Sequence, residues 1–204
     1  GGFATGFEVH AVNTFPDSVF KPGCRGKDMG WVRVCTKDAR HGRQCLEVRD
    51  DENLLRSYYP HFFTWFNVTS DVFHVAFSLK YDKGTKMRAT WRDYKIGGDI
   101  TFADGITLMV ENDKLRILSG GGLSKTIGLS DAGKWHDIDF VIRSGLGRTV
   151  FDVSVSDEFG ERETCDDLVP CSPKFRCPRW LGFLSESEKG VSYFIDDYLC
   201  ENTK

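Results

Sequence analysis

The segment from Asp71 to Asp82 reads DVFHVAFSLKYD and decides the class of fold. Large apolar residues stand at every second position, with polar or small residues between them. One face carries Phe73, Val75, Phe77, Leu79 and Tyr81, and the other carries His74, Ser78 and Lys80. A period of two is typical of a strand with one face in the core and one in solvent. We therefore predict a long half-buried strand over 71–82.

The same alternation recurs on both sides of this segment. Segments 134–143 and 149–156 alternate in the same way, and 105–118 is typical of a hairpin with a polar turn at 111–113. Further strands are predicted over 7–12, 31–35, 45–50, 62–68, 87–91, 100–102, 180–185 and 192–200. The chain is therefore expected to be β-rich along its whole length.

Evidence for helices is poor, because no stretch repeats apolar residues with helical spacing. The 21 glycines interrupt the chain at short intervals, as antiparallel turns require. The segments 15–29 and 163–179 are rich in Pro, Gly and Cys, and we predict long loops there. Many half-buried strands bury their apolar faces best against one another. We predict an all-β, two-sheet antiparallel sandwich that forms one domain over 1–204, with its first and last strands paired.

Composition excludes several classes of function. A formal net charge of −3 gives no field that would gather nucleic acid or anionic lipid. No apolar run approaches the roughly 18 residues that span a bilayer. No signal peptide opens the chain, and its Gly-Gly start leaves a removed one open. No nucleic-acid partner and no membrane span are expected, and the oligomeric state is left open.

Seven cysteines are many for a reducing compartment. They form the groups Cys24/Cys35/Cys45 and Cys165/Cys171/Cys177, with Cys200 apart. No Cys-x-x-Cys pair is present, which disfavours a zinc site. We therefore expect at least two disulfides, one within the second group and one involving the first. Disulfides in turn favour a secreted, periplasmic or cell-surface location.

A set of short motifs, in order along the chain, resembles a known superfamily. These are GFE at 6–8, CLEVRD at 45–50, FSL at 77–79, GKWH at 133–136 and FIDD at 194–197. The order resembles the concanavalin A-like jelly rolls, which include lectins, laminin-G-like domains, carbohydrate-binding modules, glucanases and lyases. The resemblance spans nearly the whole chain. It implies a jelly-roll sandwich more strongly than any one activity, because one fold hosts many functions.

The resemblance also implies a structural calcium site. Its Phe-Glu, Gly and Ile-Asp-Asp elements correspond here to Glu8, Gly42, Asp196 and Asp197. Calcium takes six to eight oxygens, so carboxylates and turn carbonyls are suitable ligands. Strand parity predicts that Asp196 and Asp197 point to opposite faces, so that only one would face the ion. The alternative is that these acids are solvated or pair with nearby arginines.

The segment 86–95 is the best candidate for ligand contact. Alternation places Arg88, Thr90 and Arg92 on one face and Trp91 on the other. With Tyr94, and with His74 and Lys80 from a neighbouring strand, these residues are predicted to line a groove for a glycan. Arginines favour an acidic or sulfated glycan. The alternative is an ordinary solvated sheet face.

A second candidate surface lies in the aromatic segment 58–66. His61, Phe63 and Trp65 share one strand face, and Phe62 and Phe66 share the other. One face must belong to the core. The opposite face is either a platform for stacking sugars or a second core surface.

Enzyme motifs of the superfamily are missing. The paired-acid pattern Glu-x-Asp-x-x-Glu of glucanases is absent, and so are the Arg-x-Glu-x-Arg and Gln-x-His strands of alginate lyases. We therefore predict a non-catalytic carbohydrate-binding or adhesion-like module of an exported protein. The alternative is a small polysaccharide lyase or glycoside hydrolase. A lyase would use His74, Tyr81 or Tyr94 as the base, with an arginine to neutralise charge.

Overall fold

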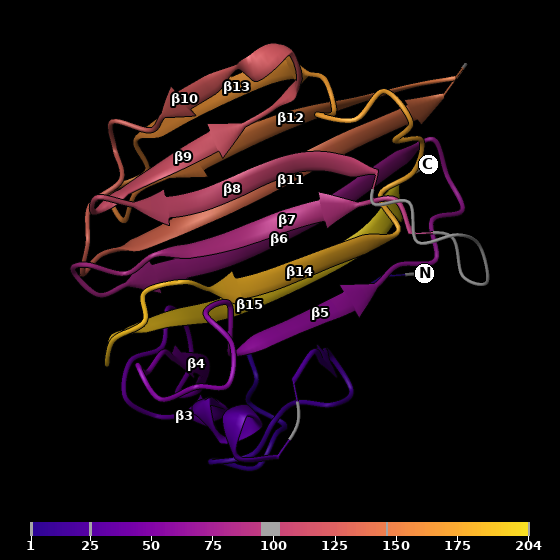
Figure 1. Cartoon of the computed structure of the whole chain (residues 1–204). Coiled ribbons are helices and arrows are strands. Elements are labelled where there is room, and N and C mark those ends of the chain that lie inside the picture. The colour runs from indigo at the N-terminus through magenta and orange to yellow at the C-terminus, as the bar shows by residue number, and fades with distance from the viewer. Residues whose placement is uncertain (1, 25, 95–102, 146, 204) are drawn as a thin grey trace.

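Two antiparallel sheets face each other in the computed structural model, which describes residues 2–24, 26–94, 103–145 and 147–203 (Figure 1). Helix accounts for 4% of the structure, as two short 3-10 turns at Gly26–Trp31 and Gly120–Gly122. The predicted all-β, two-sheet sandwich is confirmed. No helix in the described part of the chain has the length and apolar content needed to cross a membrane.

The eight-stranded sheet has the order β13-β12-β11-β6-β15-β4-β3, with β1 also paired to β15. Its strands are β13 (Arg162–Leu168), β12 (Arg148–Ser156), β11 (Trp135–Gly145), β6 (Val72–Tyr81), β15 (Ser192–Thr203), β4 (Cys45–Arg49), β3 (Val32–Cys35) and β1 (Phe3–Thr5). The strand predicted from the decisive segment, β6, lies at the middle of this sheet between β11 and β15.

The seven-stranded sheet has the order β10-β9-β8-β7-β14-β5-β2. Its strands are β10 (Ser124–Thr126), β9 (Lys114–Leu118), β8 (Asp104–Glu111), β7 (Met87–Arg92), β14 (Trp180–Ser185), β5 (His61–Trp65) and β2 (Lys21–Pro22). The predicted hairpin is β8–β9, and β14 has the predicted bounds. This sheet carries the candidate ligand-binding residues on β7.

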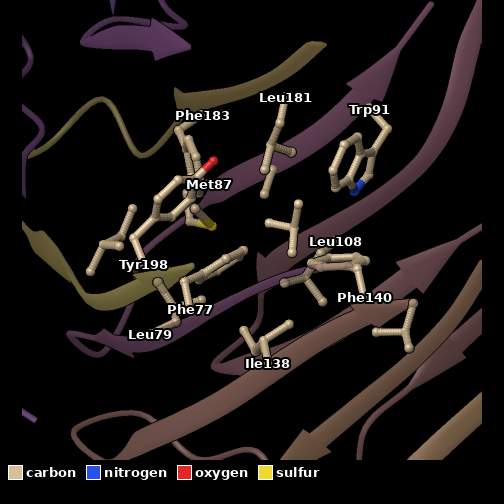
Figure 2. Close-up of a cluster of buried hydrophobic side chains, with 14 of the residues drawn as sticks. Phe77, Leu79, Met87, Trp91, Leu108, Ile138, Phe140, Leu181, Phe183 and Tyr198 are labelled. Atoms are coloured by element: carbon tan, nitrogen blue, oxygen red, sulfur yellow. The ribbon is translucent and has the colours of Figure 1, made fainter. Parts of the chain in front are cut away.

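Apolar side chains from both sheets meet in one core (Figure 2). Phe77 and Phe140 come from the eight-stranded sheet, and Trp91, Leu108 and Phe183 come from the other. Trp91 is completely buried, as the alternation of β7 predicts. Each fully buried side chain of this size contributes about 1.5–3 kcal/mol. Burial of Trp91 fixes which face of β7 points outward.

Two segments differ from their predicted structure. Residues 7–12 form turns, with Phe7 at a φ of 65°, and the first strand is instead Phe3–Thr5. The second is β13, which occupies the start of the predicted loop 163–179. Its pattern was hidden because Cys165 is its one buried residue and charged side chains surround it. The predicted strand at 100–102 lies outside the described residues.

The first and last strands pair, although the first is β1 rather than the predicted 7–12. Phe3 lies opposite Cys200 and Thr5 lies opposite Tyr198. A β-bulge interrupts β15 between Asp196 and Leu199, and Asp197 adopts a φ of 48° within it. The bulge lies beside the segment that carries Glu8, so the two ends of the chain meet at one place.

The structure joins no two of the described cysteines, so the expected disulfides stay a prediction. Within the second group, Cys165 packs into the core from β13, whereas Cys171 is exposed. In the first group, Cys35 and Cys45 lie opposite each other on β3 and β4.

Candidate ligand-binding groove

A groove with a volume of about 580 Å³ runs over the outer face of the seven-stranded sheet. It exists because β7 turns Met87, Ala89 and Trp91 into the core and leaves the alternate residues outside. Its lining residues are Gly23, Tyr58, His61, Arg88, Thr90, Arg92, Tyr94, Asp104, Thr107, Leu118, Cys171, Leu184 and Glu186.

Each arginine in the groove is paired with an acid. Arg88 Nε donates to Glu186 Oε2 at 2.9 Å, and Arg92 Nε donates to Asp104 Oδ1 at 3.0 Å. Arg92 Nη1 also donates to the Tyr94 hydroxyl at 2.9 Å. Two guanidinium charges therefore face two carboxylate charges. The groove as a whole is not basic, unlike the face of β7 taken alone.

Hydroxyl groups form the floor between the two ion pairs. The Thr90 and Thr107 hydroxyls lie 2.9 Å apart, joining β7 to β8. Arg88 and Arg92 are four residues apart on β7, which places their backbones roughly 13 Å apart along the strand. The groove therefore has an ion pair toward each end and neutral hydroxyls in the middle, which suits an extended polar ligand.

Aromatic rings border the Arg92 end of the groove. The Tyr94 and Trp180 ring centroids are 5.1 Å apart, those of Phe63 and Trp180 are 5.6 Å apart, and those of Trp65 and Tyr94 are 5.7 Å apart. The Arg92 guanidinium lies 5.3 Å from the Trp180 ring centroid, within cation–π range. Trp65 keeps 42% of its surface exposed, so a flat apolar ring remains open to a ligand.

The two faces of β5 divide as the alternation predicts. Phe62 is completely buried in the core and stacks on Phe183 with ring centroids 5.0 Å apart. His61, Phe63 and Trp65 lie on the face away from the core, where the rings of His61 and Phe63 pack against Trp180. The outward face is therefore a cluster of rings beside the groove.

His61 is a neutral imidazole at the edge of the groove. Burial, with a smaller effect of the Arg92 charge, lowers the pKa of His61 to about 4. Its Nε2 is buried and has no hydrogen-bond partner among the described residues. Its ring packs against Gly23, where any side chain would overlap the imidazole. His61 therefore adds no positive charge to the groove at neutral pH.

The structure brings together four of the five predicted ligand-contact residues. Arg88, Thr90, Arg92 and Tyr94 line the groove. His74 lies instead in the eight-stranded sheet, where Nε2 is 2.9 Å from Asp139 Oδ2 and Nδ1 is 3.1 Å from Glu201 Oε1. The prediction failed for His74, and for Lys80 with it, because the chain changes sheets between β6 and β7.

Four further residues that shape the groove were not predicted from the sequence. Asp104, Thr107 and Glu186 line the groove, and Trp180 supports its aromatic edge. Asp104 and Thr107 belong to the strand paired with β7, while Trp180 and Glu186 lie on or directly after the other neighbour, β14. The identity of the strands beside β7 was the missing information, and alternation within a strand does not provide it.

The four residues predicted to bind calcium also come together, around the connection 36–44. Glu8 Oε1 accepts the backbone N–H groups of Arg43 at 2.7 Å and Gln44 at 2.8 Å. Gly42 directly precedes Arg43 and has a φ of 70°. A side chain at this position would overlap the Glu8 carboxylate. These contacts join the N-terminal segment to the β3–β4 connection.

Both aspartates reach the same connection from β15. Asp196 Oδ2 accepts the backbone N–H groups of Arg40 at 2.8 Å and His41 at 3.1 Å. Asp197 Oδ2 lies 2.6 Å from His41 Nδ1. The β-bulge turns both carboxylates to one side, so the parity argument that only one would do so is wrong. Burial raises the pKa of Asp196 to about 6, and the backbone hydrogen bonds from Arg43 and Gln44 lower that of Glu8.

The fit to calcium is partial. The connection presents N–H groups rather than carbonyls to Glu8 Oε1 and Asp196 Oδ2. Across the described residues, no three His, Cys, Asp or Glu side chains group as metal ligands. Glu8 Oε2 and Asp197 Oδ1 accept no hydrogen bond from described residues and are the carboxylate oxygens left for an ion. Calcium at this place stays a prediction.

No protein-family model and no curated protein sequence matches the chain. Solved structures do. The catalytic domain of a glycoside hydrolase family 131 protein from Coprinopsis cinerea superposes with a TM-score of 0.63 at 12% identity, over 98% of this chain and 93% of that one. A carbohydrate esterase of the Shiga toxin-encoding bacteriophage phi24B also gives 0.63, at 8% identity over 100% of both chains.

A plant lectin has the same architecture. Basic winged bean lectin gives a TM-score of 0.57 at 10% identity, over 98% of this chain and 97% of that one. Identities this low establish the fold and nothing finer. The fold is a jelly-roll β-sandwich, which the sequence motifs implied.

Proposed function

We propose that this chain is a non-catalytic carbohydrate-binding module whose glycan lies in the groove over β7. The observation that carries the proposal is one arrangement: two Arg–carboxylate pairs, a hydroxyl floor and an exposed aromatic edge on a single sheet face. Sugars present hydroxyls that both donate and accept hydrogen bonds, together with apolar ring faces that stack on aromatic side chains. The groove offers partners for both kinds of surface.

The charge balance of the groove favours a neutral glycan. Glu186 and Asp104 offset Arg88 and Arg92, and His61 is uncharged. An acidic polysaccharide would have to compete with these carboxylates for each guanidinium. A neutral glycan can instead donate hydroxyls to the acids and accept from the arginines. This replaces the acidic glycan that the β7 face alone suggested.

The placement of the acids supports binding without hydrolysis. Glycoside hydrolases hold two carboxyl groups about 5–9.5 Å apart across the scissile bond. Asp104 lies opposite Arg92, whereas the backbone N–H of Glu186 bonds the Lys86 carbonyl at 2.8 Å. Lys86 and Arg92 are six residues apart, roughly 20 Å along the strand. Each acid is also engaged by its own arginine.

A polysaccharide lyase is the second candidate, on one specific observation. The neutral His61, the Tyr94 hydroxyl and the Arg92 guanidinium meet at the same end of the groove. A lyase needs a base to remove a sugar proton and a cation to stabilise the resulting charge. An alginate lyase, Aly36B, is among the structures of the same fold, with a TM-score of 0.57 at 10% identity. The buried Nε2 of His61 makes binding the stronger proposal.

The experiment is a glycan array probed with the labelled chain, followed by calorimetric titration of each hit at low and high salt. We expect binding to a neutral glycan with an affinity nearly independent of salt. Binding confined to acidic glycans and weakened by salt would contradict the neutral class. Release of unsaturated sugar products would favour the lyase. We place the module outside the cytoplasm, as its cysteine content and a polysaccharide ligand both favour.

A further inference from the structure

Cys35 and Cys45 face each other across the last pair of the β3–β4 ladder. They are direct register partners in adjacent antiparallel strands. Opposed residues in such strands have Cα atoms about 4.5–5.5 Å apart, within the range of about 4.4–6.8 Å that a disulfide spans. Their sulfur atoms are 3.6 Å apart. The register therefore meets the backbone requirement for a disulfide between them.

The pair lies in a small apolar cluster separate from the main core. Cys35, Cys45, Trp135 and Phe194 form this cluster, and Ala39 packs against it. The Cys45 thiol also donates to the Asp38 carbonyl oxygen at 2.6 Å. The cluster therefore holds both thiols between the sheet and the 36–44 connection.

We propose that Cys35 and Cys45 form a reversible disulfide that closes the base of the 36–44 connection. The oxidant is a small-molecule disulfide such as oxidised glutathione. The Cys35 thiolate attacks one glutathione sulfur, forms a mixed disulfide and releases one glutathione thiolate. The Cys45 thiolate then displaces the second glutathione from Cys35. Two protein thiols are oxidised, one glutathione disulfide is reduced to two thiols, and the two protein protons pass to the departing thiolates.

The order of attack follows from the contact between the thiols. The contact with the Cys45 side chain lowers the pKa of Cys35 to about 7, against the effect of burial. The same contact, together with burial, raises the pKa of Cys45. A thiolate is the attacking species, so Cys35 reacts first at neutral pH.

The bond would constrain a connection that anchors both ends of the chain. Residues 40 and 41 hold Asp196, and residues 43 and 44 hold Glu8. A covalent ring through Cys35 and Cys45 removes much of the freedom of this connection in the unfolded chain. We therefore expect the oxidised chain to melt at a higher temperature than the reduced chain.

The test equilibrates the full chain in oxidised and in reduced glutathione, blocks free thiols by alkylation in denaturant, and maps the peptides without reduction. The oxidised chain is expected to lose two hydrogen atoms, to yield one cross-linked peptide pair containing Cys35 and Cys45, and to melt higher. Dithiothreitol reverses all three changes. Cys35→Ser and Cys45→Ser each abolish the link and the increase in melting temperature. Cys171→Ser, at an exposed thiol, keeps both.

Alkylation of both Cys35 and Cys45 after oxidation would overturn the proposal. So would a link from either residue to a different cysteine or to glutathione as the final product. Peptide mapping of the unaltered chain decides between these outcomes even if a serine variant fails to fold.

Discussion

The indole of Trp180 lies across the backbone of Gly182, so close that a Cβ at position 182 would overlap the ring. Both residues belong to β14, where Gly182 lies opposite Thr90 on β7 and Phe63 on β5. The missing side chain lets Trp180 lie flat against the strand, where Arg92 and Tyr94 pack over it. Gly182 therefore makes room for the ring of Trp180, which supports the aromatic edge of the groove.

Gly182→Ala is therefore expected to push Trp180 off the strand and to weaken both fold and groove. Forced overpacking costs about 1–3 kcal/mol. Chemical denaturation followed by tryptophan fluorescence measures this, and the fluorescence of the folded state should change as well. Gly145→Ala is the matched control, because the nearest atom, Asp71 Cγ, lies 3.9 Å from its added Cβ. Equal stabilities of the two variants would contradict the packing of Trp180.

Replacement of Arg92 by Ala should weaken glycan binding about 10- to 100-fold. This follows from a charged hydrogen bond worth about 1.5–3 kcal/mol. Arg88→Ala should act in the same direction, and the double variant should bind no ligand. Both side chains are part-exposed, so the free energy of unfolding should change by less than about 1 kcal/mol. Calorimetric titration and thermal melts measure the two effects. Arg143→Ala, on β11 in the other sheet, should bind normally.

The two faces of β5 should respond differently to alanine. Trp65→Ala removes an exposed ring and is expected to reduce binding with little loss of stability. Phe62→Ala opens the core and should cost about 3–5 kcal/mol. Parallel denaturation and binding curves separate the two outcomes. A Trp65→Ala variant with wild-type affinity would place the ligand away from the aromatic edge.

His61 and His74 should affect stability in opposite directions as pH changes. The folded-state pKa of His61, about 4, is below its unfolded value near 6.5, so His61 lowers stability as pH falls from about 6.5 to 4. Against the effect of burial, Asp139 and Glu201 raise the pKa of His74. The contribution of His74 is therefore fully present below about pH 6.5 and is lost as pH rises through its folded pKa.

Melting curves of two glutamine variants between pH 4 and 8 measure these contributions. His61→Gln should remove part of the acid destabilisation, and His74→Gln should lose stability mainly at the acid end. The same pH profile for both variants would contradict the two environments.

Calcium should raise the melting temperature of the chelator-treated chain by mass action. An ion at 100 times its dissociation constant adds about 2.7 kcal/mol. Glu8→Gln should remove the increase, because it removes a carboxylate charge from the site. Magnesium is the control ion. A melt unchanged by calcium would mean that the hydrogen bonds from the 36–44 connection alone anchor Glu8 and Asp196.

The sequence was sufficient to predict which side chains face the groove and which face the core wherever the answer depended on one strand alone. Alternation in β7 predicted Arg88, Thr90 and Arg92 outside and Trp91 inside, and alternation in β5 separated Phe62 from Trp65. It was insufficient to predict which residues line the groove wherever this depended on which strands are neighbours in the sheet. His74 lies on β6, the strand that precedes β7 in the chain, and still belongs to the other sheet. Asp104 and Glu186 reach the groove because β8 and β14 are the neighbours of β7.

Local irregularities account for the other differences. The left-handed backbone at Phe7 is incompatible with the strand predicted over 7–12. The same conformation at Asp197 interrupts the alternation of side chains along β15. Neither residue is a glycine, so composition gave no warning. In β13 a single inward residue, Cys165, is too little to produce a recognisable period.

The pairing of Phe3 with Cys200 has a consequence for any longer protein that contains this chain. Segments that precede β1 and follow β15 would leave the module from two paired strands of one sheet. Such a module adds almost no length between its neighbours and projects from the main chain as a side branch. It can also be inserted into a surface loop of a host protein without separating the ends of that loop.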